Sequence, residues 1–213
     1  MAPRLRLTLL GVGAMASPRF APAGLLLAYG RRRVVFDGGP GAEPPAGPLE
    51  AWLVTDEQAE LRPALRRLAA RRGLAPGMVD ADLGDLRIHA LPVAHTSHPT
   101  CGYRVEAGGL TAVWAPEFWT FPAWAANADL MFAEASGWNR PIRFRGGVGG
   151  HAPVRETARE AARRGTGRLV YAHIGRPCLR AMDAGLTPEY GEWGREGHTY
   201  VLAGTADHRP RAP

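Results

Sequence analysis

Short apolar runs separated by glycine and proline turns dominate the chain. Residues 4–10 read Arg-Leu-Arg-Leu-Thr-Leu-Leu, an alternation with period two that predicts a half-buried strand. Residues 24–29 and 33–36 are apolar, and the Gly30 and arginines between them predict a hairpin. We expect further strands at residues 51–55, 86–93, 103–106, 110–114, 130–134, 168–172 and 199–203.

Helical spacing of apolar residues is confined to a few segments. Residues 57–72 place leucines on one face and charges on the other, which predicts a helix. A second helix is expected at residues 153–164, with Pro153 in its first turn and Gly165 and Gly167 after its end. Residues 122–127 fit a short helix. Hairpins combined with covering helices predict an α/β (α+β) protein, an αββα sandwich of two mixed sheets. We expect one domain over residues 1–204 and a polar tail over 205–213.

Composition and charge narrow the classes of partner. All 26 cationic residues are arginine, and the formal net charge is +6. These arginines are scattered among many Ala, Gly and Pro residues, which indicates compositional bias, so we disfavour a nucleic-acid partner. No apolar run approaches the roughly 20 residues that cross a bilayer, so no membrane partner is expected. A homodimer is compatible with the sequence.

Two features bear on the cellular compartment. Cys101 and Cys178 form no paired motif, which favours a reducing, cytoplasmic compartment. Residues 7–16 imitate a secretory leader with an Ala-Met-Ala site, but Gly11 and Gly13 interrupt the apolar stretch. We therefore favour a first β-strand here.

Eight segments, in order along nearly the whole chain, resemble the metallo-β-lactamase fold, and in particular ribonuclease Z and the small cyclic-phosphate phosphodiesterases. They include a strand that ends in Asp-Gly-Gly, a segment Ala-Asp-Leu-Met-Phe-Ala-Glu-Ala and a Gly-His-Ala turn. The segments are residues 9–13, 34–39, 53–61, 94–95, 111–117, 128–135, 150–152 and 169–174. The resemblance implies the αββα fold and a metal-dependent hydrolase.

The resemblance also implies an altered metal site. The signature of the family supplies three histidines and one aspartate to two zinc ions, whereas the matching positions here are Asp56, Gln58, Glu60 and Leu61. The bridging aspartate position is occupied by Glu117, and two metal-type histidines are present, His95 and His173.

The candidate ligands form two groups that share Glu117. One is Asp56, Gln58, His95 and Glu117, and the other is Glu60, Glu117 and His173. His98 is a further candidate. An oxygen-rich set suits harder ions, so we expect one divalent ion (Mn, Fe or Zn) rather than two, or none.

The same resemblance assigns the proton chemistry. His151 would donate a proton to the leaving group, and Glu134 would orient His151 or His173. The sequence therefore predicts a divergent metal-dependent hydrolase acting on a small-molecule phosphodiester or similar small ester. The alternative is a catalytically silent member of the fold that serves as a binding or assembly module. A tRNA nuclease ranks last, because no segment is long enough for a protruding arm.

Most of the candidate residues also have a purely structural interpretation. Asp56 follows a strand and would cap the next helix. Gln58 and Glu60 would be solvent-facing residues of that helix's first turn. His95 and His173 would be hydrogen-bonded core residues at strand ends.

Overall fold

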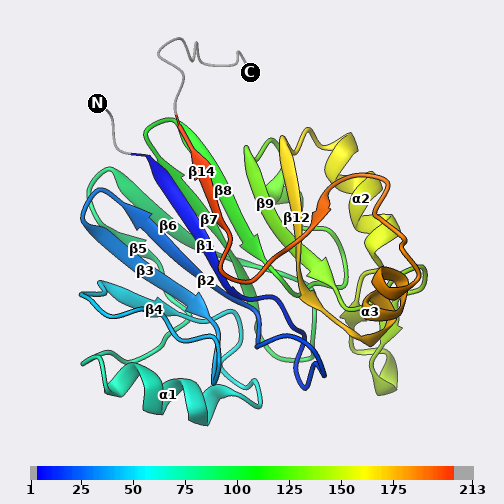
Figure 1. The fold of residues 1–213 in the computed structure, drawn as a ribbon, viewed down its shortest axis with the longest axis horizontal. Helices are drawn as coiled ribbons and strands as arrows, with labels where there is room; N and C mark the ends of the chain where they lie inside the picture. The colour runs from blue at the N-terminus through cyan, green and yellow to red at the C-terminus, as the bar shows by residue number, and fades with distance from the viewer. Residues whose placement is uncertain (1–3, 204–213) are drawn as a thin grey trace.

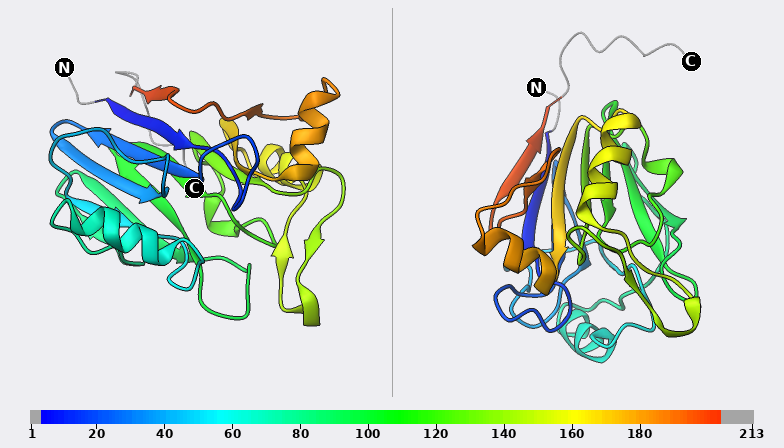
Figure 2. Two further views of the ribbon diagram at one scale, coloured as in Figure 1. Left: turned by 60° about the horizontal axis from the view of Figure 1, so that its bottom comes forward. Right: turned by 90° about the vertical axis from the view of Figure 1, so that its right-hand side faces the viewer.

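Two mixed β-sheets stack face to face in the computed structural model, which describes residues 4–203 (Figures 1 and 2). The first sheet has the order β14-β1-β2-β3-β4. Its strands are β1 (Leu5–Gly11), β2 (Gly24–Tyr29), β3 (Arg32–Asp37), β4 (Ala51–Leu53) and β14 (Thr199–Leu202). All pairs in it are antiparallel except β3 with β4.

The second sheet has the order β13-β12-β9-β8-β7-β6-β5. Its strands are β5 (Ala81–Asp82), β6 (Leu86–Pro92), β7 (Cys101–Ala107), β8 (Leu110–Ala115), β9 (Leu130–Ala135), β12 (Arg168–Ile174) and β13 (Glu192–Trp193). The pairs from β8 through β9 and β12 to β13 are parallel. A separate two-stranded ladder joins β10 (Ile142–Arg143) to β11 (Gly150–His151).

Helices cover the outer faces of the sandwich (Figure 2). Helix α1 (Arg62–Ala70) packs on the first sheet, and α2 (Val154–Arg163) packs on β9 and β12. The remaining helical elements are α3 (Arg176–Asp183) and the 3-10 turns η1 (Ala123–Ala125) and η2 (Arg145–Gly147). The predicted αββα sandwich of two mixed sheets is confirmed.

The core explains why several strands read as continuous apolar runs. In β2, Leu25 and Leu27 face the second sheet within the main core. Leu26 points the opposite way and packs with Trp52 and Leu65 under α1. Because both faces of the sheet are covered, a strand has no reason to alternate between apolar and polar residues.

The helix predicted at residues 57–72 is shorter in the structure. It begins at Arg62, directly before Pro63, and Leu61 is its N-cap residue. Proline has no backbone N–H and is tolerated in the first turn of a helix but not further in. Residues 56–61 therefore form turns, which changes where their side chains point. The short helix expected at 122–127 is the single turn η1.

Several features of the chain were not predicted or lie beyond the structure's description. The sequence analysis did not anticipate α3, β5, β10, β11 or β13. The tail predicted at 205–213 lies outside the described residues. None of the helices within residues 4–203 has the length and apolar character needed to cross a membrane.

Candidate active site

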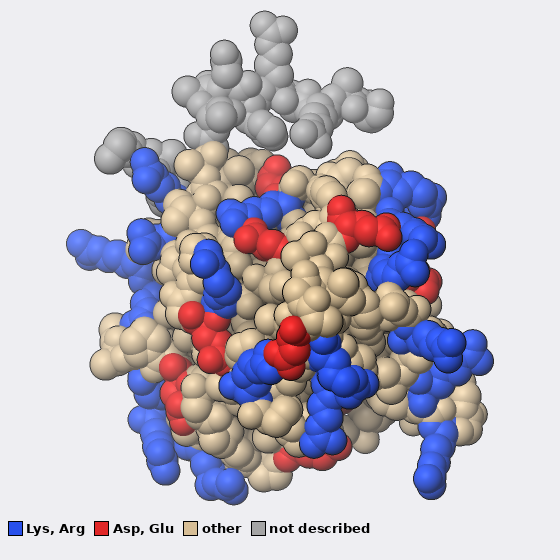
Figure 3. Space-filling model, turned by 45° about the vertical axis from the view of Figure 1, so that its right-hand side comes forward, with Lys and Arg blue, Asp and Glu red and all other residues tan. Residues whose placement is uncertain are grey.

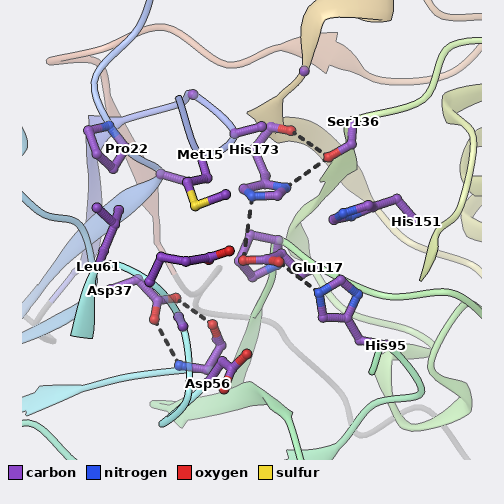
Figure 4. A pocket seen from close by; sticks show the side chains of 18 of the residues that line it. Met15, Pro22, Asp37, Asp56, Leu61, His95, Glu117, Ser136, His151 and His173 are labelled. Atoms are coloured by element: carbon purple, nitrogen blue, oxygen red, sulfur yellow. Dashed lines mark hydrogen bonds and ion pairs between the residues drawn. The ribbon is translucent and has the colours of Figure 1, made fainter. Parts of the chain in front are cut away.

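A cavity of about 630 Å³ opens where the carboxyl ends of several strands meet between the two sheets (Figure 4). Asp37 ends β3 and lines the cavity, Glu117 follows β8, Ser136 follows β9 and His173 is in β12. Because the ends of these strands lie next to one another, residues that are distant in sequence meet at the cavity. The cavity therefore collects side chains from nearly the whole chain.

Glu117 lies between two imidazoles. Its Oε2 is 2.8 Å from His95 Nε2, and its Oε1 is 3.4 Å from His173 Nε2. Burial alone would raise the pKa of Glu117, but the charges of His173 and His95 lower it to about 2. Conversely, burial would lower the pKa of His173, but Glu117 and Glu134 raise it to about 9. The three groups form a charged cluster without any ion.

Glu134 is fully buried and holds the neighbouring part of the cluster. Its Oε2 accepts a hydrogen bond from His151 Nδ1 at 2.7 Å, and its Oε1 accepts one from the Ser136 backbone N–H at 2.7 Å. The Phe118 N–H is a further donor, 3.2 Å from Oε2. Burial would raise the pKa of Glu134, but His151 and His173 hold it well below its usual range. Glu134 is therefore an ionised carboxylate that fixes the His151 ring.

In His95, His151 and His173, the ring nitrogen Nδ1 has a hydrogen-bond partner that fixes the orientation of the ring. Nδ1 of His95 donates to the Gly150 carbonyl at 2.9 Å, and Nδ1 of His173 is 3.0 Å from Ser136 Oγ. Nδ1 of His151 is held by Glu134 as described. This leaves Nε2 of each ring for other partners. Metal-binding histidines are characteristically held in this way through the nitrogen that does not bind the ion.

The donor set fits one divalent ion. Ligand atoms of His95, Glu117 and His151 lie within 4.8 Å of one another. Two imidazoles and one carboxylate form a common catalytic zinc set, and the same donors also suit iron. By distance His151 completes this set, whereas His173 groups with Glu134 and His151. His173 is linked to the first set through Glu117, whose two oxygens face the Nε2 atoms of His95 and His173.

His173 reaches the cavity through an irregular backbone. Its φ is +60°, and the pairing of β12 with β9 shifts register between Tyr171 and Ile174. A left-handed conformation is costly for a residue with a side chain and persists where the surroundings enforce it. The irregularity points the imidazole at Glu117 rather than into the sheet.

Comparison with known proteins fits this geometry. The family model described as the β-lactamase superfamily domain matches residues 43–174 of this chain. The chain belongs to the β-lactamase superfamily. None of the curated protein sequences matches the chain.

Solved structures show the same fold at low sequence identity. The metallo-β-lactamase fold protein YhfI from Bacillus subtilis has a TM-score of 0.71 at 16% identity, covering 94% of this chain and 100% of its own. A diphosphatase from the PhnP family gives 0.69 at 14% identity, with 93% and 97% covered. The short form of human tRNase Z gives 0.68 at 14% identity, with 92% and 98% covered. Zinc-bound PqqB from Methylobacterium extorquens gives 0.67 at 14% identity, with 92% and 100% covered.

In this superfamily member, the structure divides the predicted site residues into two sets. His95, Glu117, Glu134, His151 and His173 lie together around the cavity. Asp56, Gln58 and Glu60 line the same cavity, but within residues 4–203 they form no ion pair with that cluster. The two predicted ligand groups that shared Glu117 are therefore not assembled as such.

Asp56 is instead engaged with His98. Both carboxylate oxygens lie 3.0 Å from His98 Nε2, and Oδ1 also accepts the Gln58 N–H at 2.7 Å. The interpretation of Asp56 as a helix cap is wrong, because α1 begins later and Leu61 is its N-cap residue. Gln58 and Glu60 are exposed, but they precede the helix rather than forming its first turn.

Sequence reasoning did not include Asp37 or Ser136 among the site residues. Asp37 accepts hydrogen bonds from the Thr55 backbone N–H at 2.8 Å, from Thr55 Oγ1 at 3.0 Å and from Trp114 Nε1 at 2.7 Å. Burial raises the pKa of Asp37 to about 6 despite these donors. The available signal was the position of Asp37 at a strand end before two glycines.

Proposed function

We propose that this protein is a hydrolase that uses one divalent metal ion to cleave a small phosphodiester or related ester. The observation that carries the proposal is the position of Glu117 between His95 and His173, with Nδ1 of each imidazole fixed by a second partner. The names of two similar structures, a diphosphatase and a tRNase Z, associate phosphate-ester chemistry with this fold.

His95, Glu117 and His173 would hold the ion. A bound ion of this kind lowers the pKa of a coordinated water and polarises the phosphoryl oxygen. Glu117 compensates the positive charge of the site with a carboxylate that is ionised at neutral pH. His95 and His173 keep their orientation through the Gly150 carbonyl and Ser136 Oγ.

The Glu134–His151 pair would supply the proton. Hydrolysis forms one P–O bond to water and breaks the P–O bond to the leaving alcohol, whose oxygen must take up a proton. His151 lies within 4.8 Å of the ligand atoms of His95 and Glu117, so it is close to where the ester would react. Glu134 fixes the ring through Nδ1, which leaves Nε2 to donate that proton.

A second candidate, a catalytically silent binding module, has one specific observation in its favour. Buried carboxylates without a metal must be neutralised by partners. Here Glu117 is paired with His95 and His173, and Glu134 with His151. The cluster is therefore electrostatically satisfied without an ion.

The test combines metal content with turnover. The protein is purified without chelator or affinity metal, and bound Mn, Fe and Zn are measured by mass spectrometry. Hydrolysis of diphenyl phosphate, whose phenol leaving group takes up a proton at neutral pH, is then followed for wild type, Glu117→Gln and His151→Gln. We expect near-stoichiometric metal and turnover in wild type, and loss of both in Glu117→Gln. His151→Gln should keep its metal but lose turnover.

Three results would contradict the proposal. Wild-type protein that binds no ion and is not stabilised by any added divalent ion would point to the silent module. Metal lost in His151→Gln would make His151 a ligand rather than the proton donor. Turnover retained in Glu117→Gln would show that the cluster around Glu117 is not the active site.

A further inference from the structure

Part of the cavity wall is an apolar patch of Met15, Pro22 and Leu61 that faces the charged cluster. Met15, Pro22 and Leu61 lie on one side of Glu117, whereas Ser136, His151 and His95 lie on the other (Figure 4). Met15, Pro22 and Leu61 lie in the segments between β1 and β2 and between β4 and α1, whereas Ser136 follows β9 and His151 is in β11. A molecule in the cavity would therefore touch chemically opposite surfaces.

The apolar wall is continuous with the packed interior. Leu61 packs against the cluster that α1 forms on the outer face of the first sheet. Gly39 lies behind the wall: a Cβ there would be 3.3 Å from Pro22 Cγ and 3.5 Å from Leu61 Cδ1. Met15 is 48% exposed, so the wall extends to the cavity mouth. A ligand group placed here would remove apolar surface from water.

The charges along the cavity disfavour a polyanion. Of the described residues that line it, Arg176 is the one arginine, and its side chain is exposed at the start of α3. Carboxylates line it in greater number, namely Asp37, Asp56, Glu60 and Glu117. On the face drawn in Figure 3, arginines are interspersed with acidic residues. A nucleic acid would find few cations to neutralise its phosphates.

We infer that the substrate is a small ester with an uncharged, apolar alcohol or aryl group, which rests on Met15, Pro22 and Leu61 while the ester faces Glu117 and the histidines. This inference rests on the proposed function and names its substrate class. A cavity of about 630 Å³ is within the range of small-molecule sites. Leu61, a residue without ligand atoms, thereby becomes a specificity-determining residue.

The test uses a series of n-alkyl 4-nitrophenyl phosphates from methyl to pentyl, with the metal-loaded protein. We expect kcat/KM to rise about threefold to fourfold per methylene that the wall buries, as the transfer energy of a methylene requires. Leu61→Asn and Met15→Ser should flatten this dependence. Leu186→Asn changes a leucine that is 48% exposed outside the cavity and should leave it unchanged.

A second readout does not depend on turnover. Binding of n-alkylphosphonates of increasing length is measured by calorimetry for wild type, Met15→Ser and Leu186→Asn. Affinity that rises with chain length, and that Met15→Ser weakens, would support the inference even if no diester is hydrolysed, in which case the proposed function alone fails.

Two outcomes would overturn the inference while leaving the proposed function intact. One is hydrolysis whose kcat/KM does not depend on alkyl length. The other is faster hydrolysis of thymidine 5′-(4-nitrophenyl phosphate), which has a polar nucleoside group, than of the pentyl ester. Because Met15 is on an exposed loop, Met15→Ser should leave the fold intact, and an effect of this variant on the alkyl-length dependence would not be caused by misfolding.

Discussion

Replacing Glu117 with glutamine should change how the stability of the metal-free protein depends on pH. In wild type the pKa of His173 is about 9, compared with 6.5 in an unfolded chain. At about 1.36 kcal/mol per pKa unit, this difference corresponds to about 3 kcal/mol. The pKa shifts of His173, Glu117 and Glu134 describe the same interactions, so the energies of the carboxylate shifts are not added to this value.

The sign follows from the direction of each shift. A raised histidine pKa adds stability below pH 6.5, and that stability is lost as the pH rises through about 9. The lowered pKa of Glu117 adds stability above pH 4.5, and that stability is lost as the pH falls towards 2. The ion pair therefore contributes most between pH 4.5 and 6.5.

Urea unfolding in the presence of a chelator measures the effect. Wild-type protein should lose about 3 kcal/mol of unfolding free energy between pH 6 and pH 9.5. Glu117→Gln should lose less, because the charge of Glu117 is the largest single contribution that raises the pKa of His173. Glu50→Gln is the matched control, since Glu50 pairs with Arg32 at the opposite end of β3.

The reasoning would be refuted by a Glu117→Gln protein that loses as much stability with pH as wild type. That result would mean that Glu117 does not hold the proton on His173. A loss in Glu50→Gln as small as in Glu117→Gln would refute it too, because the effect would then follow net charge rather than this contact.

Three further predictions follow from individual contacts. Glu134→Gln should reduce kcat about 10- to 100-fold with metal content retained, because it weakens the hold on His151, as steady-state kinetics and metal analysis would show. Asp37→Asn should lower the free energy of unfolding by about 1–3 kcal/mol in urea, since an amide N–H₂ would face the donors of Thr55 or Trp114. Asp56→Ala should keep its bound metal by mass spectrometry, because Asp56 contacts His98 outside the cluster; metal loss would return Asp56 to the ligand set.

Much of the fold could be predicted from sequence, because the strands carry strong local patterns. The alternation in β1 and the apolar runs of β2 and β3 locate three neighbours of the first sheet. The start of α1 could not be placed by apolar spacing, which continues through Leu61 into the preceding turns. Pro63 was the better signal, since a proline is confined to the first turn of a helix.

The residues of the site could be predicted only where a segment of the chain matched a segment of the family in the same order. The resemblance pointed to His95, Glu117 and His173, and the structure brings them together. Spacing could not show where Asp56 points, because that depends on the turns between β4 and α1. Nor could it show that a positive φ at His173 directs this imidazole into the cavity.

Two departures from the superfamily pattern act together. Glu117 stands where the resemblance leads one to expect an aspartate, and its carboxylate contacts the imidazoles of both His95 and His173. Leu61 removes a ligand from the side of the cavity that faces α1 and replaces it with apolar surface. The charged cluster around Glu117 therefore shares the cavity with an apolar patch at Leu61, although Asp37, Asp56 and Glu60 line the cavity as well. One ion beside an apolar surface is consistent with both changes, whereas two ions would need a ligand where Leu61 stands.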